Sequence, residues 1–537
     1  MCSYTPLRLR SIAVRWPSPL RLTVKIGAVK WRDLDEKSAN MTPFPERIPL
    51  VFSVSLVLIG WAFVWGRRFE RREPRIKLGA APFVGKWDLR ISSSIIPVLL
   101  FAVAAVWLFP RMLGVLSDVW SIVVSAGIAA GFAFGLAAAD GLSAVLSPVV
   151  DPNEYLANLE LLPKVGDLLL LHSNYDFLVD RTVHMKGHPP GFVLILKGLA
   201  AIGLGAPWTV GALSFLGIAL IVSAVAVTVR AVSNGSTMRL VLPFLALTPF
   251  CVWLGTSADA FFSGVAAWGI AFLTLAVRNG GARSRLLLGL AGGLCLTGAL
   301  FLTYGAATIL VLVAISVLTG MRKRFVPTFQ VATAAFVPAV VITGVFYHFG
   351  FWWLDGLRLT NKFYWNGSAY FRTWTYFLLA NVAVLLMAIG PAVIAGIASL
   401  RDRKLWPVVG GALVCITNAE VSQYSKGEVE RIWLLFMPWL VPAVAALAQS
   451  QPQPQLDRHP QLDPQPKLQP QLRLKAKQVG EVHNLAKLEP HNTTWSDEPV
   501  HVGPEAYVAS PMIVPTKWLV SQVVLAFVLQ ALLRSKW

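Results

Sequence analysis

The chain has 537 residues, of which 55% are hydrophobic and only 14% are charged. Its apolar residues form many separate runs long enough to cross a bilayer, which excludes an ordinary soluble enzyme and predicts an all-α polytopic membrane protein. The 47 Lys and Arg against 28 Asp and Glu give a net charge of +19. Because most basic residues lie in short connectors and at the N-terminus, membrane topology and anionic headgroups explain this charge better than nucleic acid does.

The predicted elements begin after a basic arm, residues 1–47, which we expect to be disordered. Several of the apolar runs that follow are only about 14 residues long and would be short, tilted or re-entrant, so we expect about 11–13 transmembrane helices in the cytoplasmic membrane. The runs lie near residues 48–65, 93–110, 120–139, 207–229, 239–254, 258–277, 285–302, 304–320, 328–348, 375–400, 405–418, 431–448 and 517–533.

Basic connectors predict which side of the membrane each loop faces. Residues 278–285, 321–324 and 401–404 are basic and two spans apart, so we place them on the cytoplasmic side. Counting spans from them puts a long first loop, residues 140–206, on the outer side. The basic stretch 67–77 then also falls outside. Either one early run does not cross the membrane, or the charge rule is broken there.

The long first loop carries the candidate catalytic residues. Asp140 ends a run of small apolar residues at the membrane boundary, where partial desolvation would suit a general base. Asp151 and Glu154 are the next acids along the loop. Loops of this length without spans are usually functional, although each carboxylate would also suit a helix end or cap.

Two prolines form a stiff elbow at the end of this loop, in the sequence GHPPG at residues 187–191. They fix φ and withhold two backbone donors, so they predict the entrance to a juxtamembrane helix, with His188 held towards a cleft or the membrane surface. His184 lies four residues earlier, and both histidines are candidate substrate-binding residues. This spacing would suit a metal site on one helical face, but the prolines interrupt the helix and we assign no metal ligand. A divalent cation, Mg or Mn, stays open as a cofactor.

A second outer segment, residues 422–440, supplies candidate substrate-binding residues. Lys426 and Arg431 would hold a phosphate, Arg431 through a bidentate fork and Lys426 as a point charge, with Glu428 between them. A solvated charged turn is the alternative.

Asp259 and Tyr304 are further candidates because each lies at the predicted outer end of a span. Asp259 would either cap a helix or contribute to a polar cleft. Tyr304 would line an acceptor groove or belong to an interfacial aromatic belt.

The C-terminal part divides into a linker and one last span. Residues 449–515 open with a Gln/Pro repeat that cannot bury a core, so we expect a disordered linker inside the cell. Residues 516–537 would form a C-terminal transmembrane helix. The main membrane domain is then residues 48–448.

Together these features resemble the C-type, multi-spanning glycosyltransferases that use polyprenyl-phosphate sugars, such as the protein O-mannosyltransferases and aminoarabinose transferases. The shared pattern is an acid at the end of an early span, a long outer loop and an HPP elbow before a juxtamembrane helix. The chain is most similar to actinobacterial integral membrane proteins of this superfamily, through GHPPG at 187–191, EYL at 154–156 and GEVERIW at 427–433.

The resemblance implies a sugar donor whose lipid tail lies in the bilayer and whose phosphate lies at the outer surface. An acidic loop residue would act as base on the hydroxyl of an envelope glycan, lipid or protein acceptor. It makes Asp140 the first candidate base. The family often has two acids together in this loop, whereas Gly141 follows Asp140 here, so Asp151 and Glu154 stay open as alternatives.

Two other functions remain open from the sequence. A transporter or flippase of an envelope precursor would place ionisable residues near the bilayer midplane, whereas here they gather at one predicted face. A non-catalytic scaffold would keep the same fold without the chemistry.

Overall fold

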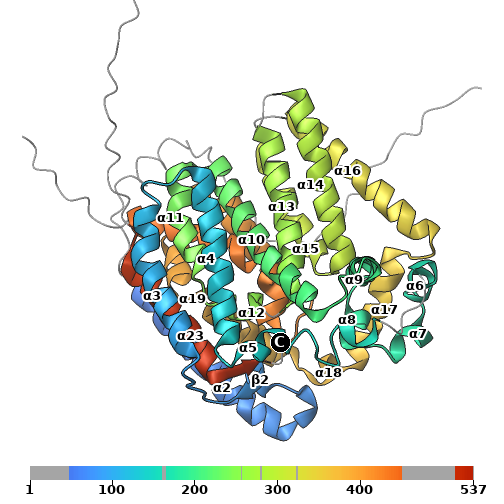
Figure 1. The fold of residues 1–537 in the computed structure, drawn as a ribbon, viewed down its shortest axis with the longest axis horizontal. Helices are drawn as coiled ribbons and strands as arrows, with labels where there is room; N and C mark the ends of the chain where they lie inside the picture. The colour runs from blue at the N-terminus through green and yellow to red at the C-terminus, as the bar shows by residue number, and fades with distance from the viewer. Residues whose placement is uncertain are drawn as a thin grey trace, which may run out of the picture. The chain divides into compact units, whose positions relative to one another are not determined.

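The computed structural model describes residues 47–159, 165–255, 257–278, 281–321, 325–449 and 514–535. The expected N-terminal arm and nearly all of the expected Gln/Pro-rich linker lie outside these residues. The described chain is almost entirely helical, which confirms the all-α polytopic prediction (Figure 1).

Eight helices of the described chain are long and apolar enough to cross a membrane. A helix pairs most of its backbone groups internally, which is what a bilayer requires of a spanning segment. They are α2 (Arg47–Arg72), α3 (Ile95–Met112), α4 (Asp118–Ala138), α10 (Pro207–Val232), α13 (Asp259–Arg278), α14 (Ala282–Leu302), α16 (Phe325–His348) and α19 (Trp374–Ser399).

The other predicted runs form shorter or broken helices, which is why fewer long helices are seen than the 11–13 expected. Three are continuous: α15 (Ala306–Met321), α20 (Trp406–Val421) and α23 (Thr516–Leu532). The run 239–254 is divided into α11 (Gly235–Ala246) and α12 (Cys251–Leu254).

The run 431–448 is bent by 61° between residues 435 and 437. Pro438 and Pro442 lack the N–H that a continuous α-helix needs, so the backbone follows tighter turns instead. The resulting segments are α21 (Val429–Ile432), the 3-10 turns η3 (Trp433–Leu435), η4 (Met437–Trp439) and η5 (Val441–Val444), and α22 (Ala445–Gln449).

Short helices fill the two large connectors. The elbow behaves as predicted, because α9 begins at Gly191 with Pro190 as its N-cap. In Figure 1 α6 to α9 lie close to α17. The short helices are α5 (Leu142–Leu146), η2 (Leu156–Asn158), α6 (Val165–Leu171), α7 (Tyr175–Val179), α8 (Val183–Gly187) and α9 (Gly191–Ala201), then α17 (Trp353–Asn366) and α18 (Ser368–Phe371).

Close helix contacts in the core rely on small residues. A Cβ added to Gly217 of α10 would lie 2.4 Å from the backbone of Ala260 at the start of α13. No side chain fits in that gap. Membrane helices approach each other most closely where such small residues face one another, and this crossing brings the start of α13 to a fixed position beside α10.

A small antiparallel sheet, which the sequence analysis did not anticipate, connects the two ends of the described chain. Its strands are β1 (Gly79–Ala80), β2 (Phe83–Trp87) and β3 (Leu533–Ser535), in that order. In the β2–β3 pair, Lys86 is opposite Arg534. After β2 the pairing continues, because the Asp88 N–H donates to the Leu532 carbonyl over 3.0 Å. The turn η1 (Pro74–Ile76) precedes β1.

A break in α19 also ties the last helix to the bundle. Gly390 has a φ of +75° and is followed by Pro391, which has no N–H, so the helical hydrogen-bond ladder is interrupted here. Gln522 of α23 donates from Nε2 to the Ile389 carbonyl over 2.9 Å. A polar side chain from a neighbouring helix thus pairs a carbonyl at the break.

Contacts between connectors place the basic stretch 67–77 at one end of the bundle. The Ile76 carbonyl accepts a 3.0 Å hydrogen bond from Nε of Arg372, which lies two residues before the start of α19. Arg90 pairs with Asp140 over 3.6 Å. The basic stretch therefore lies at the same end of the bundle as the long first loop, with α2, α3 and α4 all long enough to cross.

Candidate functional site

A buried arginine lies at the centre of the candidate site. Arg431 belongs to α21, and its side chain is only 8% exposed. Its Nε lies 3.0 Å from Oδ2 of Asp259, its Nη2 3.9 Å from Oε2 of Glu428, and its Nη1 4.0 Å from Oε1 of Glu154. One guanidinium therefore joins acids from three separate segments, a geometry that suits its planar fork of donors.

Glu154 brings a histidine into this cluster. Its Oε1 lies 2.9 Å from Nε2 of His184, and both side chains are largely buried. Thr182 caps α8 with its hydroxyl and so fixes the turn that carries His184. The ring of Tyr155 packs against His184 at 5.3 Å and against Phe192 at 4.8 Å between centroids. Burial raises the pKa of the Tyr155 hydroxyl well above its ordinary value, so that hydroxyl stays protonated.

Asp259 is held at the start of α13. Ser257 donates from its hydroxyl to Oδ2 of Asp259 over 2.8 Å and accepts from the Asp259 N–H over 3.1 Å. The oxygen that accepts from a backbone N–H at this helix start belongs to Ser257 and not to Asp259. Because Oδ2 of Asp259 pairs with Arg431, Asp259 belongs to the polar cluster, the other alternative that the sequence left open.

A second arginine, Arg372, was not identified from the sequence and contacts Glu428, which also approaches Arg431. Arg372 is buried and lies 3.2 Å from Oε1 of Glu428. Burial alone would raise the pKa of Glu428, but Arg372 and Arg431 outweigh it and lower that pKa, so Glu428 is ionised. Arg372 also donates to the Lys426 carbonyl over 2.8 Å. Its only sequence signal is an Arg just before a span, which is common for interfacial anchors.

Asn381, from inside α19, fixes the loop before α21. It accepts from the Gly427 N–H over 3.1 Å and donates to the Ser425 carbonyl and to Oε2 of Glu420, over 2.6 and 2.8 Å. Gly427 has a φ of +86°, which favours glycine. A lone Asn in an apolar helix was the signal that the sequence analysis overlooked.

Two of the three predicted catalytic acids lie apart from the cluster's ion pairs. Asp140 pairs with Arg90 over 3.6 Å. Asp151 accepts hydrogen bonds from the backbone and side chain of Asn153, over 2.8 and 2.9 Å, and so forms a local turn. Of the three, Glu154 is the acid that the structure joins to the predicted substrate-binding residues.

His188 lies beside the cluster without an ion pair of its own among the described contacts. Its ring packs on Tyr155 at 6.0 Å and on Phe262 at 5.7 Å between centroids. Its carbonyl lies 3.0 Å from Nε2 of His172. Since a carbonyl only accepts, His172 carries its hydrogen on Nε2. Burial lowers the pKa of both histidines to about 4, so both are neutral near pH 7.

This burial predicts that the protein is destabilised by mild acid. With a folded pKa of about 4 and an ordinary value of about 6.5, both histidines bind protons in the unfolded chain before they do so in the folded one. The free energy of unfolding should therefore fall as the pH drops from about 6.5 to about 4. Thermal unfolding of the detergent-solubilised protein across this range measures the effect. His172→Asn, which keeps a donor for the His188 carbonyl, should reduce the pH dependence; an unchanged dependence would contradict a buried neutral His172.

Tyr304 and Lys426 lie at a neighbouring aromatic surface. The Tyr304 ring packs on Trp353 at 5.3 Å, and burial raises the pKa of its hydroxyl. The Lys426 ammonium lies over the ring of Trp365 at 4.3 Å, and burial lowers its pKa. Both aromatic partners belong to α17, so this helix lines the predicted substrate-binding residues on one side.

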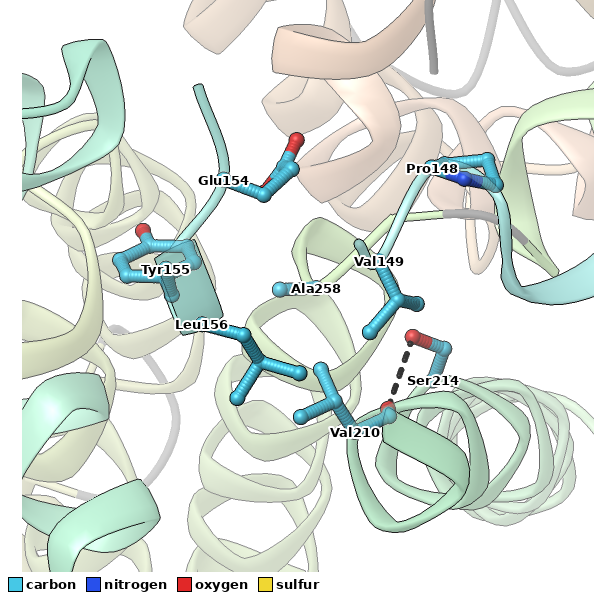
Figure 2. A pocket seen from close by; sticks show the side chains of 8 residues that line it. All are labelled: Pro148, Val149, Glu154, Tyr155, Leu156, Val210, Ser214 and Ala258. Carbon is cyan, nitrogen blue, oxygen red and sulfur yellow. Dashed lines mark hydrogen bonds between the residues drawn. The ribbon is translucent and has the colours of Figure 1, made fainter. Parts of the chain in front are cut away.

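A small hollow opens beside Glu154 (Figure 2). Its other walls are mostly apolar and come from the first loop, from α10 and from the residue before Asp259. They are Pro148, Val149, Tyr155, Leu156, Val210, Ser214 and Ala258. A carboxylate therefore lies at the edge of a largely apolar recess, next to the charged cluster.

The described residues contain no group of three or more His, Cys, Asp or Glu arranged to hold a metal ion. In the cluster itself, the position among Asp259, Glu428 and Glu154 is taken by the guanidinium of Arg431. The positive charge that balances these carboxylates thus comes from the Arg431 side chain. The carboxylates do not fit the divalent ion that the sequence left open.

Comparison with known proteins adds no relative. No family model, no curated protein and no solved structure matches this chain.

Proposed function

We propose that this protein is a membrane glycosyltransferase that moves a sugar from a polyprenyl-phosphate donor to a hydroxyl of a cell-envelope acceptor. One observation carries the proposal. Glu154 and His184 from the first loop, Asp259 from the start of α13, and Glu428 and Arg431 from α21 and its N-cap meet in one ion-pair cluster at one end of the membrane helices. A buried cluster of charges is costly unless its members are mutually paired, and such clusters are typical of functional sites.

Glu154 is best placed to act as the base. His184 and Arg431 both approach its Oε1, so Oε2 is the oxygen that an acceptor hydroxyl would meet. In this step Glu154 takes the hydroxyl proton, the acceptor oxygen bonds to the anomeric carbon, and the bond from that carbon to the phosphate oxygen breaks. Polyprenyl phosphate leaves with the electron pair.

Cationic side chains would stabilise the departing phosphate. Lys426 would take this role, because its ammonium lies over the Trp365 ring of α17, the helix on whose aromatic residues a sugar ring would stack. Arg431 and Arg372, already neutralised by acids, would serve to hold Glu428 and Glu154 in position.

The positions of the ionisable residues favour transfer over transport. The described central parts of α4, α10, α16 and α19 carry no Asp, Glu, Lys or Arg. A coupled transporter normally places such residues near the midplane. Here the described ion pairs lie at the helix ends, where a donor headgroup would be.

Deleting the gene and comparing envelope glycans, glycolipids and glycoproteins by mass spectrometry tests the proposal. We expect one glycan species to lose a single sugar, and the wild-type gene to restore it. The purified protein should then transfer that sugar from its polyprenyl phosphate to the truncated species. An envelope profile unchanged by deletion, or a transport defect with glycans intact, would overturn the proposal.

A further inference from the structure

The basic stretch at the end of α2 is the strongest charged feature outside the candidate site. Residues 67–90 contain eight Lys or Arg and three acids. All three acids are engaged within the stretch: Glu70 accepts from the Gly79 N–H, Glu73 pairs with Arg75, and Asp88 pairs with Arg90. The surplus positive charge is therefore not offset by the local acids.

The remaining cations are exposed on one continuous piece of structure, which we call the basic band. It consists of the end of α2, the β1–β2 hairpin and the adjoining β3, and its exposed members are Arg67, Arg68, Arg71, Arg72, Lys77, Lys86 and Arg534. The sheet holds the hairpin and β3 together. The fold thus brings Arg534, from near the C-terminal end of the sequence, to the same surface as the cations of residues 67–86.

The band lies at the edge of the membrane-spanning part. Trp65 of α2 is 45% exposed, on a helix whose apolar surface would face lipid. Arg68 lies over the Trp65 ring at 5.3 Å, and Arg67 over the Phe63 ring at 5.0 Å. Tryptophan rings favour the headgroup level of a bilayer, and arginines one turn beyond them reach the phosphates.

We propose that the basic band binds the phosphate headgroups of anionic phospholipids in the leaflet on the side of the candidate site. This explains why a strongly basic connector is kept at the end of α2, at the end of the bundle opposite to the end of α13 and the start of α14. Each Lys or Arg close to an anionic surface adds to the attraction, so several together hold a lipid shell around α2. The proposal is independent of the transferase reaction.

Native mass spectrometry of the full-length protein in a neutral detergent tests it, with no sugar donor present. Phosphatidylglycerol and phosphatidylcholine are titrated separately. We expect the wild type to retain phosphatidylglycerol preferentially. The triple variant Arg68→Gln, Arg71→Gln, Arg72→Gln should bind it at least about tenfold more weakly, whereas phosphatidylcholine binding stays the same.

A matched triple variant with Lys at the same three positions keeps the charge and should keep the preference. Equal phosphatidylglycerol binding by the Gln triple and the wild type would overturn the proposal. So would an equal loss of both lipids, which would show a damaged surface. Displacement of the lipid by millimolar inorganic phosphate would instead assign the band to a soluble anion.

Discussion

Glu154→Gln should abolish sugar transfer while leaving the protein folded. The amide keeps the size of the side chain, and its oxygen can still accept a hydrogen bond from His184 at the 2.9 Å position of Oε1. It cannot take a proton from an acceptor hydroxyl. Loss of a general base typically slows a reaction by about 10² to 10⁴-fold. The rate of transfer to the acceptor identified from the deletion strain measures the loss of activity. Thermal unfolding shows whether the variant is still folded.

Variants of two other acidic residues test whether this result is specific to Glu154. Asp180→Asn alters an exposed carboxylate in the same loop, at the end of α7, and should leave transfer close to wild type. Asp140→Asn tests the base first indicated by the family resemblance. If Asp140→Asn loses transfer and Glu154→Gln retains it, the base is Asp140 and the ion-pair cluster has another task.

Arg431→Met should destabilise the protein more than any surface charge change. Met replaces the guanidinium by an apolar chain and leaves three acids, Asp259, Glu428 and Glu154, with one cation fewer. Removing one partner of a buried ion pair typically costs about 3–5 kcal/mol, because the remaining charge stays buried without compensation. Thermal unfolding in detergent should show a large decrease in midpoint.

An exposed pair provides the matched control. Arg358 lies 2.7 Å from Asp355 on α17, with side chains 75% and 49% exposed. Arg358→Gln should change stability by less than about 1 kcal/mol. Combining Arg431→Met with Asp259→Asn should recover part of the loss, since the second change removes an uncompensated charge. A wild-type midpoint for Arg431→Met would show that the cluster does not form in the protein.

The fold class and the helix entrance followed from local signals. Apolar runs of sufficient length predict spanning helices, and two prolines after His188 predict the start of α9. The helix breaks at Gly390 and between Leu435 and Met437 could not be predicted from such local sequence signals. Their positions depend on which partner pairs the freed backbone groups, as Gln522 does for Ile389, and hydropathy carries no such information.

The site was predicted in part, for a related reason. Glu154, His184, Asp259, Glu428 and Arg431 were candidates because they lie in segments that the topology places on one side of the membrane, and the structure brings them together. Arg372 and Asn381 were missed because their importance lies in contacts with residues far away in sequence. Asp140 was ranked first by analogy, whereas its ion-pair partner, Arg90, lies just after β2, a strand that the sequence did not reveal.

The position of β3 determines what happens to the protein when the chain is cut before its last helix. The last helix joins the sheet near the first helix and also pairs a carbonyl of α19, so its attachment depends on these contacts and not only on the covalent link through residues 450–513. A chain nicked in that stretch would keep its two pieces together.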